Sequence, residues 1–523
     1  MNATLYNIVL DEVSPRLPVL SASLIFVFIA FLAQAFLKKD PLAGVPIVGK
    51  GGKGARQKLY QSGGAWDLYE EGYKKFKDGV FRLATPARSE SVVVAPKYMA
   101  ELKKLPDDVL SFDAALYEST HSEYTLMDTN TPTLPRIVRG MLNPALGLAV
   151  RLNPLISQEV MDAMTRELPQ SGEWEEVDIN AKMSRIIAIV SGRIFVGPEL
   201  CRSEEYIDMA INYTIEVMTA VYVIGLVPTW LRPLLAPYLP QIKQLTKRLK
   251  NADEILLPVV NARREADNKP DDLMQWIIDA ETKAGSDVRD IARTQLSITM
   301  AAIHTTTLTT VNIFYTLAAR PDLVPELQEE IREAVAGDNG EFGSAALQNM
   351  KKLDSLFKET ARFYPMSAVA FQRKALKPFV LSNGQVIPAG VIVEVPAGCI
   401  YADDEFFETP EVFDHLRYYK LRQSKGLHAA GTKAAEVVAN SQFVSVSESS
   451  LNFGYGRHAC PGRFFAVNEM KMIMANILLH YEVKNPDGVT ERHKNVRSGA
   501  QVGQIPKDLV PDPTKKIMIR KIK

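Results

Sequence analysis

The stretch that most constrains this chain is Phe453–Arg463, with the sequence FGYGRHACPGR. It holds Cys460, one of only three cysteines among 523 residues, and surrounds it with three glycines, two cationic side chains and a proline. Glycine relieves the backbone of Cβ clashes, so such a loop can turn sharply or pass close to a flat partner. Residues 462–481 are predicted to form a helix, which places Cys460 at or just before a helix N-terminus. The helix dipole and the nearby cations both favour a thiolate over a thiol.

Two functional interpretations of this thiolate compete with a structural one. As a nucleophile, Cys460 would need a general base, and His458 is poorly placed for that role because it lies only two residues away. As an axial ligand of haem iron, the sulfur would donate electron density that favours O–O cleavage. Phe453 would then pack near the sulfur, the glycines would let the loop pass under the porphyrin, and a cation would meet a propionate. The structural interpretation is a buried, inert cysteine in a glycine-rich turn.

The composition is that of an ordinary globular protein. The chain is 46% hydrophobic and 23% charged, with 61 basic and 61 acidic residues, which gives no indication of nucleic-acid binding. Three scattered cysteines are too few for a disulfide framework or a structural zinc site. Free thiols indicate that the functional part of the chain faces a reducing compartment.

The N-terminal segment differs from the rest. Residues 17–37 carry no charge, and a membrane-spanning helix needs about 20 such residues. Two lysines follow directly, so the positive-inside rule places residues 1–16 in the lumen and the remainder in the cytosol. A cleaved signal peptide is the alternative, although the segment before the apolar run carries only one basic residue, Arg16. Residues 38–52 are predicted to be a Pro/Gly linker, and residues 53–523 to form the catalytic domain.

Helical periodicity dominates the predicted domain. Residues 272–284, 290–319 and 321–336 are long and periodic, as is the segment after the cysteine. Residues 377–396 alternate around Asn383-Gly384, which predicts a hairpin. Residues 421–450 are expected to be irregular. The predicted fold class is therefore mainly α with a minor β part.

The stretch FGYGRHACPGR resembles the haem-binding signature of the cytochrome P-450 superfamily, Phe-x-x-Gly-x-basic-x-Cys-x-Gly, and meets every fixed position. The resemblance implies the cytochrome P-450 fold, preceded here by a single N-terminal transmembrane helix. It implies haem b as cofactor, with Cys460 as the iron ligand. Phe453, His458 and Gly462 match further cofactor-binding positions of the signature.

Other motifs of that family occur in the family's chain order. Glu359 and Arg362 resemble its Glu-x-x-Arg pair, and Arg417 takes the place of the third member of a structural ion-pair network. The segment AAIHTTT, residues 301–307, is similar to the oxygen-activation motif, which puts Thr305 at the threonine that delivers protons. His304 stands where most members carry Asp or Glu, and it can itself shuttle protons. Threonines that hydrogen-bond back to helix carbonyls are the alternative interpretation.

The resemblance extends to less certain positions. Arg139 and Arg373 match propionate-binding arginines. The substrate pocket is expected to include four further residues: Ala302, Thr306, Val369 and Gln501.

The Ala-Ile-His-Thr-Thr form resembles a branch of filamentous-fungal enzymes of secondary metabolism, similar to ent-kaurene oxidases. The resemblance implies a monooxygenase of the endoplasmic reticulum membrane, single-pass, with its catalytic domain in the cytosol and in contact with membrane lipid. It would oxidise a lipophilic terpenoid or other metabolite with O2. Electrons would come from NADPH-cytochrome P-450 reductase, because the chain has no nucleotide-binding glycine loop.

Two alternatives remain at the level of the sequence. The same haem site could catalyse desaturation, oxidative coupling or rearrangement. A cysteine-nucleophile acyltransferase is the alternative of another class, and it would be colourless.

Overall fold

The computed structural model describes residues 21–23, 26, 40–129, 131–147, 151–423, 437–497 and 506–522. The chain divides into two compact units, residues 1–46 and 47–523. The division falls inside the stretch predicted as a linker. Of the predicted anchor, residues 17–37, only residues 21–23 and 26 are described, and they are helical and exposed. The predicted lumenal segment 1–16 lies outside the described residues.

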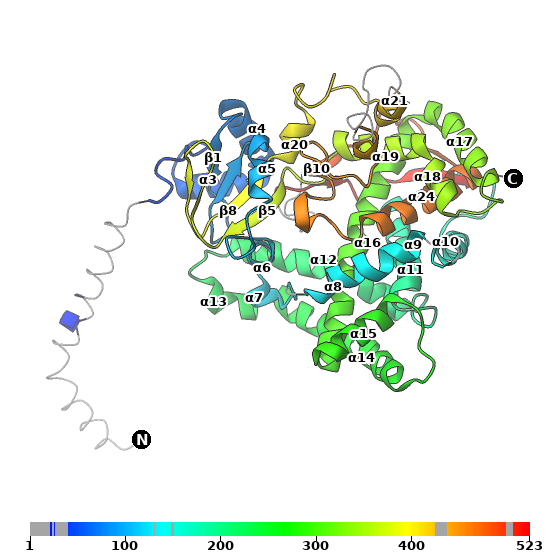
Figure 1. The fold of residues 1–523 in the computed structure, drawn as a ribbon, viewed down its shortest axis with the longest axis horizontal. Helices are drawn as coiled ribbons and strands as arrows, with labels where there is room; N and C mark the ends of the chain where they lie inside the picture. Colours follow the sequence, from blue (N-terminus) through cyan, green and yellow to red (C-terminus); the bar gives the residue numbers. More distant parts are fainter. Residues whose placement is uncertain are drawn as a thin grey trace. The chain divides into compact units, whose positions relative to one another are not determined.

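The larger unit is mainly helical with a minor sheet content (Figure 1). Its helices up to α14 are α3 Lys53–Leu59, η1 Tyr60–Gly64, α4 Ala65–Lys75, η2 Pro96–Tyr98, α5 Met99–Leu102, α6 Phe112–Ser119, α7 Ser122–Thr125, α8 Thr133–Ile137, η3 Val138–Leu142, α9 Asn143–Gly147, α10 Asn153–Glu167, α11 Ile179–Phe195, α12 Glu204–Leu226, α13 Arg232–Leu235, η4 Ala236–Tyr238 and α14 Pro240–Glu265. The later helices are α15 Leu273–Ala284, α16 Val288–Ala319, η5 Pro321–Leu323, α17 Val324–Ala336, α18 Ser344–Asn349, α19 Lys351–Phe363, α20 Ala397–Tyr401, α21 Arg417–Gln423, η6 Gly456–His458 and α24 Arg463–His480.

A five-stranded sheet forms the main β part, in the order β1-β2-β8-β5-β3. Strands β2 and β8 run parallel, and the other neighbours are antiparallel. Three smaller sheets have the orders β10-β11, β4-β12-β9 and β6-β7. The strands are β1 Val80–Leu83, β2 Ser91–Val94, β3 Leu110–Ser111, β4 Glu175–Val177, β5 Ala370–Ala375, β6 Phe379–Val380, β7 Val386–Ile387, β8 Ile392–Val395, β9 Tyr481–Lys484, β10 Asn495–Arg497, β11 Leu509–Pro511 and β12 Ile517–Lys521. The predicted hairpin is confirmed, with Gly384 of the turn at φ +84°.

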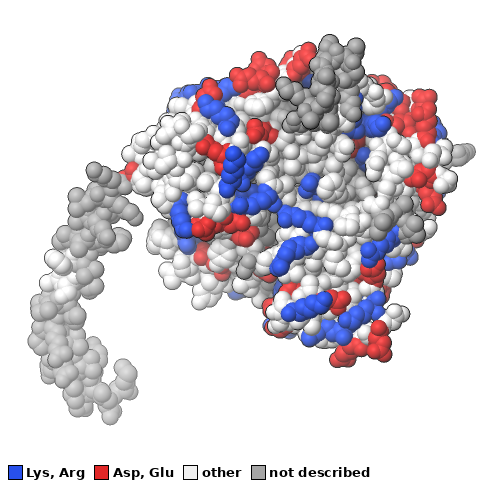
Figure 2. All heavy atoms as spheres, viewed as in Figure 1, with Lys and Arg blue, Asp and Glu red and all other residues white. Residues whose placement is uncertain are grey.

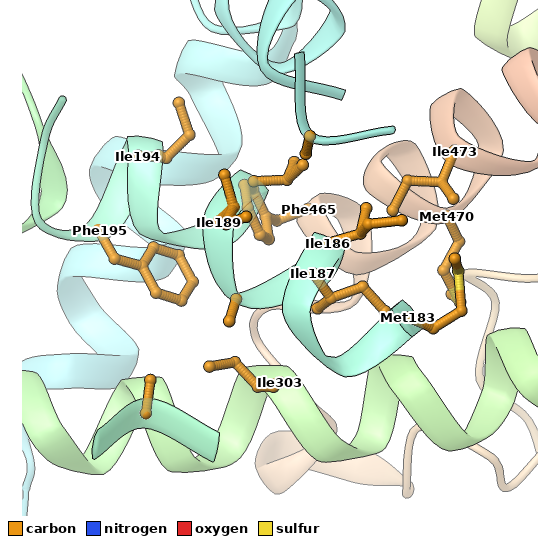
Figure 3. Packing of buried hydrophobic residues seen from close by; sticks show 14 of the residues in the cluster. Met183, Ile186, Ile187, Ile189, Ile194, Phe195, Ile303, Phe465, Met470 and Ile473 are labelled. Atoms are coloured by element: carbon orange, nitrogen blue, oxygen red, sulfur yellow. The ribbon is translucent and has the colours of Figure 1, made fainter. Parts of the chain in front are cut away.

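Helix α16 is the centre of the helical core and contacts α11, α12, α14, α19 and α24. Figure 3 shows its Ile303 below the apolar faces of α11 and α24. The rings of Phe195 on α11 and Phe465 on α24 lie 5.2 Å apart. This packing fixes the helix that begins after the cysteine loop against the helix that carries the threonine motif.

One helix in the described part of the chain, α12 (Glu204–Leu226), is long and apolar enough to cross a membrane by length and composition. It packs against α14 and α16, and ten of its residues are buried. We therefore regard it as a core helix of the larger unit.

The three consecutive threonines do not interrupt α16, although threonine is a poor helix former. The hydroxyl of Thr305 donates to the carbonyl of Ala301 at 2.9 Å, and Thr309 and Thr310 bond one turn back in the same way. These three hydroxyls bond to carbonyls of their own helix, so they do not draw the backbone into a non-helical conformation. The long helix over residues 290–319 is confirmed.

We expect acid sensitivity from His121, which is buried and has φ +48°. Burial, and then the charge of Arg232, lowers its pKa to about 4. The folded pKa is below the unfolded value of about 6.5, so the free energy of unfolding should fall as pH drops from 6.5 towards 4. The loss should reach at most about 3 kcal/mol. His121→Asn removes this titration and suits the left-handed backbone. Urea unfolding of wild type and His121→Asn across this pH range checks the prediction. An equal pH dependence of the free energy of unfolding in the two proteins would contradict it.

Candidate active site

A cavity of about 370 Å³ lies between α16, α19 and the cysteine loop. Apolar side chains supply most of its wall, and Cys460 opens into it. The residues that line it are Thr131, Leu134, Pro135, Val138, Leu142, Phe195, Ile298, Ala301, Ala302, Thr305, Thr306, Thr309, Asn312, Thr360, Ala361, Tyr364, Met366, Phe443, Asn452, Phe453, Cys460, Pro461, Gly462, Phe465, Ala466 and Met470. The cysteine signature and the threonine motif, about 150 residues apart in the chain, thus face one space.

The cysteine loop is held by its own backbone. The amide of Cys460 donates to the carbonyl of Phe453 at 2.8 Å, which closes the loop. Gly454 and Gly456 have φ values of +72° and +73°, a conformation that a side chain disfavours. Gly454 and Gly456 are therefore needed for the turn itself. Helix α24 begins at Arg463, three residues after the cysteine.

The pKa of Cys460 reflects opposing effects. Desolvation by the surrounding protein dominates and raises the pKa above its ordinary value, whereas the backbone amides of Gly462 and Arg463 and the charge of Arg463 lower it. The amides at the start of α24 are donors that lack helical partners, so they are available to an anionic sulfur. The loop is built to hold a thiolate once a positive partner offsets the burial.

Helix α16 presents Ala302, Thr305 and Thr306 to the cavity. The hydroxyl of Thr305 donates a hydrogen bond to the carbonyl of Ala301, so its lone pairs remain available as acceptors on the cavity side. His304 is placed differently: its Nε2 lies 2.8 Å from the carbonyl oxygen of Ile211 on α12, and it is not among the cavity residues. Burial lowers its pKa. This geometry does not support a proton relay through His304, and we do not propose one.

The three predicted propionate-binding cations lie beside the loop and do not line the cavity. Arg373 is buried, and its guanidinium stacks 5.0 Å from the ring centre of Phe112. The ring of His458 also stacks on Phe112, with ring centres 5.4 Å apart, and its Nε2 lies 2.7 Å from the carboxylate of Asp107. Arg139 is exposed and donates to the carbonyl of Arg457 at 2.8 Å.

Arg373 has no carboxylate within ion-pair distance in the described part of the chain. Its one hydrogen bond goes to the carbonyl of Gln372, and burial lowers its pKa to about 10. A buried guanidinium without an anionic partner is costly. This observation fits a cofactor that brings its own carboxylates to the loop, and the thiol and the apolar cavity fit the same group.

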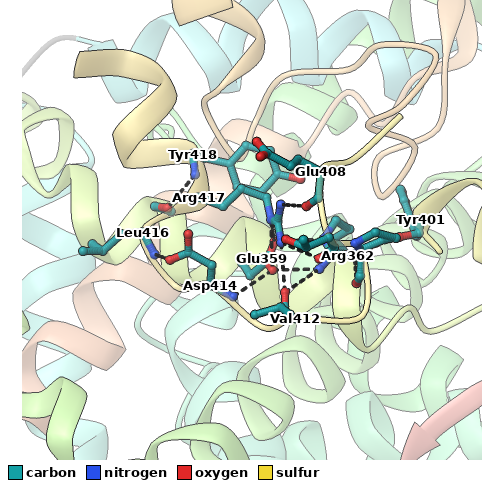
Figure 4. Close-up of polar contacts among 12 residues, drawn as sticks. Glu359, Arg362, Tyr401, Glu408, Val412, Asp414, Leu416, Arg417 and Tyr418 are labelled. Carbon is teal, nitrogen blue, oxygen red and sulfur yellow. Dashed lines mark hydrogen bonds and ion pairs between the residues drawn. The ribbon is translucent and has the colours of Figure 1, made fainter. Parts of the chain in front are cut away.

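Glu359, Arg362 and Arg417 form one buried cluster (Figure 4). Both carboxylate oxygens of Glu359 accept from Arg362, at 2.7 and 2.9 Å, and Arg417 approaches the same carboxylate at 3.1 Å. The two arginines also donate to backbone carbonyls between residues 401 and 412. The cluster therefore ties α19 to the irregular segment before the cysteine loop.

Two predicted pocket residues are not at the cavity. Val369 is buried in a separate apolar cluster with Tyr60, Leu68 and Val93, because the chain turns into strand β5 at this point. Gln501 lies outside the described residues. Met366 and Phe443 line the cavity, and Phe443 lies in a segment that carries no sequence motif.

Comparison with known proteins agrees with this site. The family model described as Cytochrome P450 matches residues 44–510. The chain is 36% identical to Cytochrome P450 monooxygenase ATR3 of Stachybotrys chlorohalonatus, over 83% of this chain and 89% of the relative. It is 34% identical to Cytochrome P450 monooxygenase braC of Annulohypoxylon truncatum, over 95% and 96%. It is 32% identical to Ent-kaurene oxidase P450-4 of Gibberella fujikuroi, over 86% of each chain.

The fold and the site define a haem-thiolate oxidoreductase. The chain belongs to the cytochrome P450 family, whose members carry haem with an axial cysteine thiolate. Membership removes the acyltransferase alternative. Cys460 would hold the iron, and Arg373 and His458 would be the cations that meet the propionates.

Proposed function

We propose that this monooxygenase oxidises a lipophilic small molecule of the terpenoid class. The observation that carries the proposal is the apolar cavity above Cys460, into which Thr305 projects. Apolar walls with a few polar groups are typical of sites for lipophilic ligands. The name of the Gibberella fujikuroi relative, an ent-kaurene oxidase, supports the terpenoid class for this chain.

The protein's own groups have separable tasks in this reaction. Haem, when bound, supplies the activation of O2. The apolar wall orients the substrate and excludes water. The hydroxyl of Thr305 can accept a hydrogen bond from a water in the cavity, because its own proton is engaged by Ala301. A water held at this oxygen would pass protons from solvent into the cavity.

We also propose that electrons come from NADPH through a separate reductase. Figure 2 shows Lys and Arg side chains gathered over the middle of one face, with Asp and Glu mostly nearer its edge. Arg139 and Arg457, which meet beside the cysteine loop, are both exposed. Exposed cations there would steer an acidic partner. The proposed location is the endoplasmic reticulum membrane, with residues 17–37 as a single-pass anchor and the catalytic unit in the cytosol.

Reconstitution tests the substrate class. The full-length protein is combined with NADPH-cytochrome P450 reductase in microsomes and supplied with terpenoid hydrocarbons, beginning with ent-kaurene, under isotopically labelled dioxygen. Substrate-dependent NADPH oxidation and labelled product are expected. Product without label would favour desaturation, coupling or rearrangement. A haem-loaded enzyme that oxidises fatty acids but no terpenoid would contradict the proposed class.

Thr305→Ala is expected to uncouple the reaction. Haem and substrate binding should remain, while NADPH consumption yields hydrogen peroxide in place of product. Coupling should fall about 10²-fold, the lower end of the contribution that positioned proton transfer makes. His304→Ala is the matched control on the same helix, and its coupling should stay at the wild-type value because the ring bonds to α12. Product formed per NADPH oxidised decides. Full coupling in Thr305→Ala would remove this hydroxyl from the mechanism.

A further inference from the structure

A second polar cluster lies on α19, where Asp354 stands between one and two turns before Glu359 and Lys358 directly precedes it. Its members are Asp354 and Lys358, joined by Arg422 of α21 and Lys471 of α24. Asp354 and Lys358 are 3% and 2% exposed, so neither charge is free to be satisfied by solvent. The cluster shares no side chain with the Glu359 network, and no sequence motif indicated it.

The cluster forms hydrogen bonds to the backbone of residues 440–443. The Nζ of Lys358 donates to the carbonyls of Asn440 at 2.6 Å and Gln442 at 2.8 Å. Arg422 donates to the carbonyl of Ser441 at 2.7 Å. In return, the carboxylate of Asp354 accepts from the amide of Phe443 at 3.0 Å. Four consecutive residues are thus held by charge-assisted hydrogen bonds, which are stronger than neutral ones.

The segment held in this way touches the cysteine loop at two points. The ring of Phe443 lies 5.1 Å from the ring of Phe453, and both line the cavity. The carbonyl of Phe453 in turn accepts the amide of Cys460. Arg463 makes the second link, since it donates to the carbonyls of Val444 at 3.0 Å and Cys460 at 2.8 Å.

Burial and neighbouring charges shift the pKa values of Asp354 and Lys358. Burial opposes the ionisation of Asp354, but the charges of Lys471 and Arg422 hold its pKa below the ordinary value. Burial lowers the pKa of Lys358 to about 7, although Asp354 opposes the shift. A lysine kept in such a site without a carboxylate of its own is costly to stability. Both of its hydrogen bonds go to the segment beside the cysteine loop, and its Nζ also lies 4.9 Å from the ring centre of Tyr418 on α21.

We propose that Lys358 and Asp354 are positioning residues that set the cysteine loop through residues 440–444. They act on Cys460 through the Phe443–Phe453 contact and through Arg463, independently of the Glu359–Arg362–Arg417 network. Without them the loop can relax away from the geometry that thiolate ligation requires. The proposal rests on the haem-thiolate class alone and is independent of the substrate.

Lys358→Met tests the proposal, because methionine keeps the length of the side chain and removes its donors. Lys351→Met is the matched control, an exposed lysine on the same helix. The readout is the spectrum of the reduced carbon monoxide complex of the purified, haem-loaded protein, followed over time below its melting temperature. Lys358→Met should convert from the thiolate form to the form without thiolate about tenfold faster than wild type, given the loss of two charge-assisted hydrogen bonds.

Asp354→Asn is the second variant, since an amide oxygen can still accept from Phe443 while the charge that pairs with Arg422 and Lys471 is lost. It should also convert faster than wild type, and it decides the test if Lys358→Met accumulates no haem-loaded protein. A role in global stability alone would lower the melting temperature and leave the conversion rate unchanged. Wild-type conversion rates in both variants, with or without lowered melting temperatures, would overturn the proposal.

Discussion

Cys460→Ala is expected to abolish haem-thiolate ligation and, with it, monooxygenase activity. Among the described residues that line the cavity, the sulfur atoms belong to Cys460, Met366 and Met470, and a thioether cannot supply an anionic ligand. Wild type should show the red-shifted Soret band of its reduced carbon monoxide complex that is typical of the family, and the variant should lack it.

Cys399→Ala is the matched control for this experiment. That thiol is half-buried beside Tyr73 and Asp403, away from the cavity residues, and burial raises its pKa. Its replacement should leave the spectrum unchanged. A thiolate-type band in Cys460→Ala, or a wild type that stays colourless after haem supplementation, would contradict the assignment of the ligand.

Arg362→Ala is expected to leave little folded, haem-loaded protein. Arg362 is 2% exposed and Glu359 is fully buried, so the substitution leaves a carboxylate buried with one remaining cation, Arg417. Breaking a buried pair costs about 3–5 kcal/mol, which is a large share of a domain's stability. Haem content and the free energy of unfolding in urea measure the loss.

A surface pair provides the comparison. Arg320 binds Asp322 at 2.8 Å, but both side chains are about half exposed, at 46% and 59%. Arg320→Ala should change the free energy of unfolding by no more than about 1 kcal/mol. If the two arginine variants proved equally stable and equally haem-loaded, the buried network would have no structural role.

The sequence alone was sufficient for the cofactor ligand and for much of the secondary structure. The cysteine loop is determined by local, contiguous residues, because glycine positions and a following helix are properties of the chain itself. The hairpin at Asn383-Gly384 and the long helix containing Thr305 follow from periodicity and turn chemistry in the same way. The order of the motifs along the chain indicated the cytochrome P450 family, and the comparison with known proteins confirms it.

The direction of single side chains depended on tertiary packing. His304 and Thr305 are neighbours on α16, but one residue rotates a helix by about 100°, so the threonine faces the cavity and the histidine faces α12. Periodicity in α16 could not choose between them, because most of this helix is buried on all sides. Val369 was misplaced for a related reason, since it packs into the apolar cluster with Tyr60 and Leu68 just before strand β5 begins.

The sequence contained the side chains of the second α19 cluster but not their partners. Lys358 meets the backbone 82 and 84 residues later, and Asp354 meets an amide 89 residues later. Backbone carbonyls and amides have no residue-specific signal, so bonds to them cannot be found from a pattern of side chains. The sequence by itself predicted which sulfur would bind iron, and only the tertiary structure decided which buried charges hold that sulfur's loop, because those bonds exist only after distant segments have packed together.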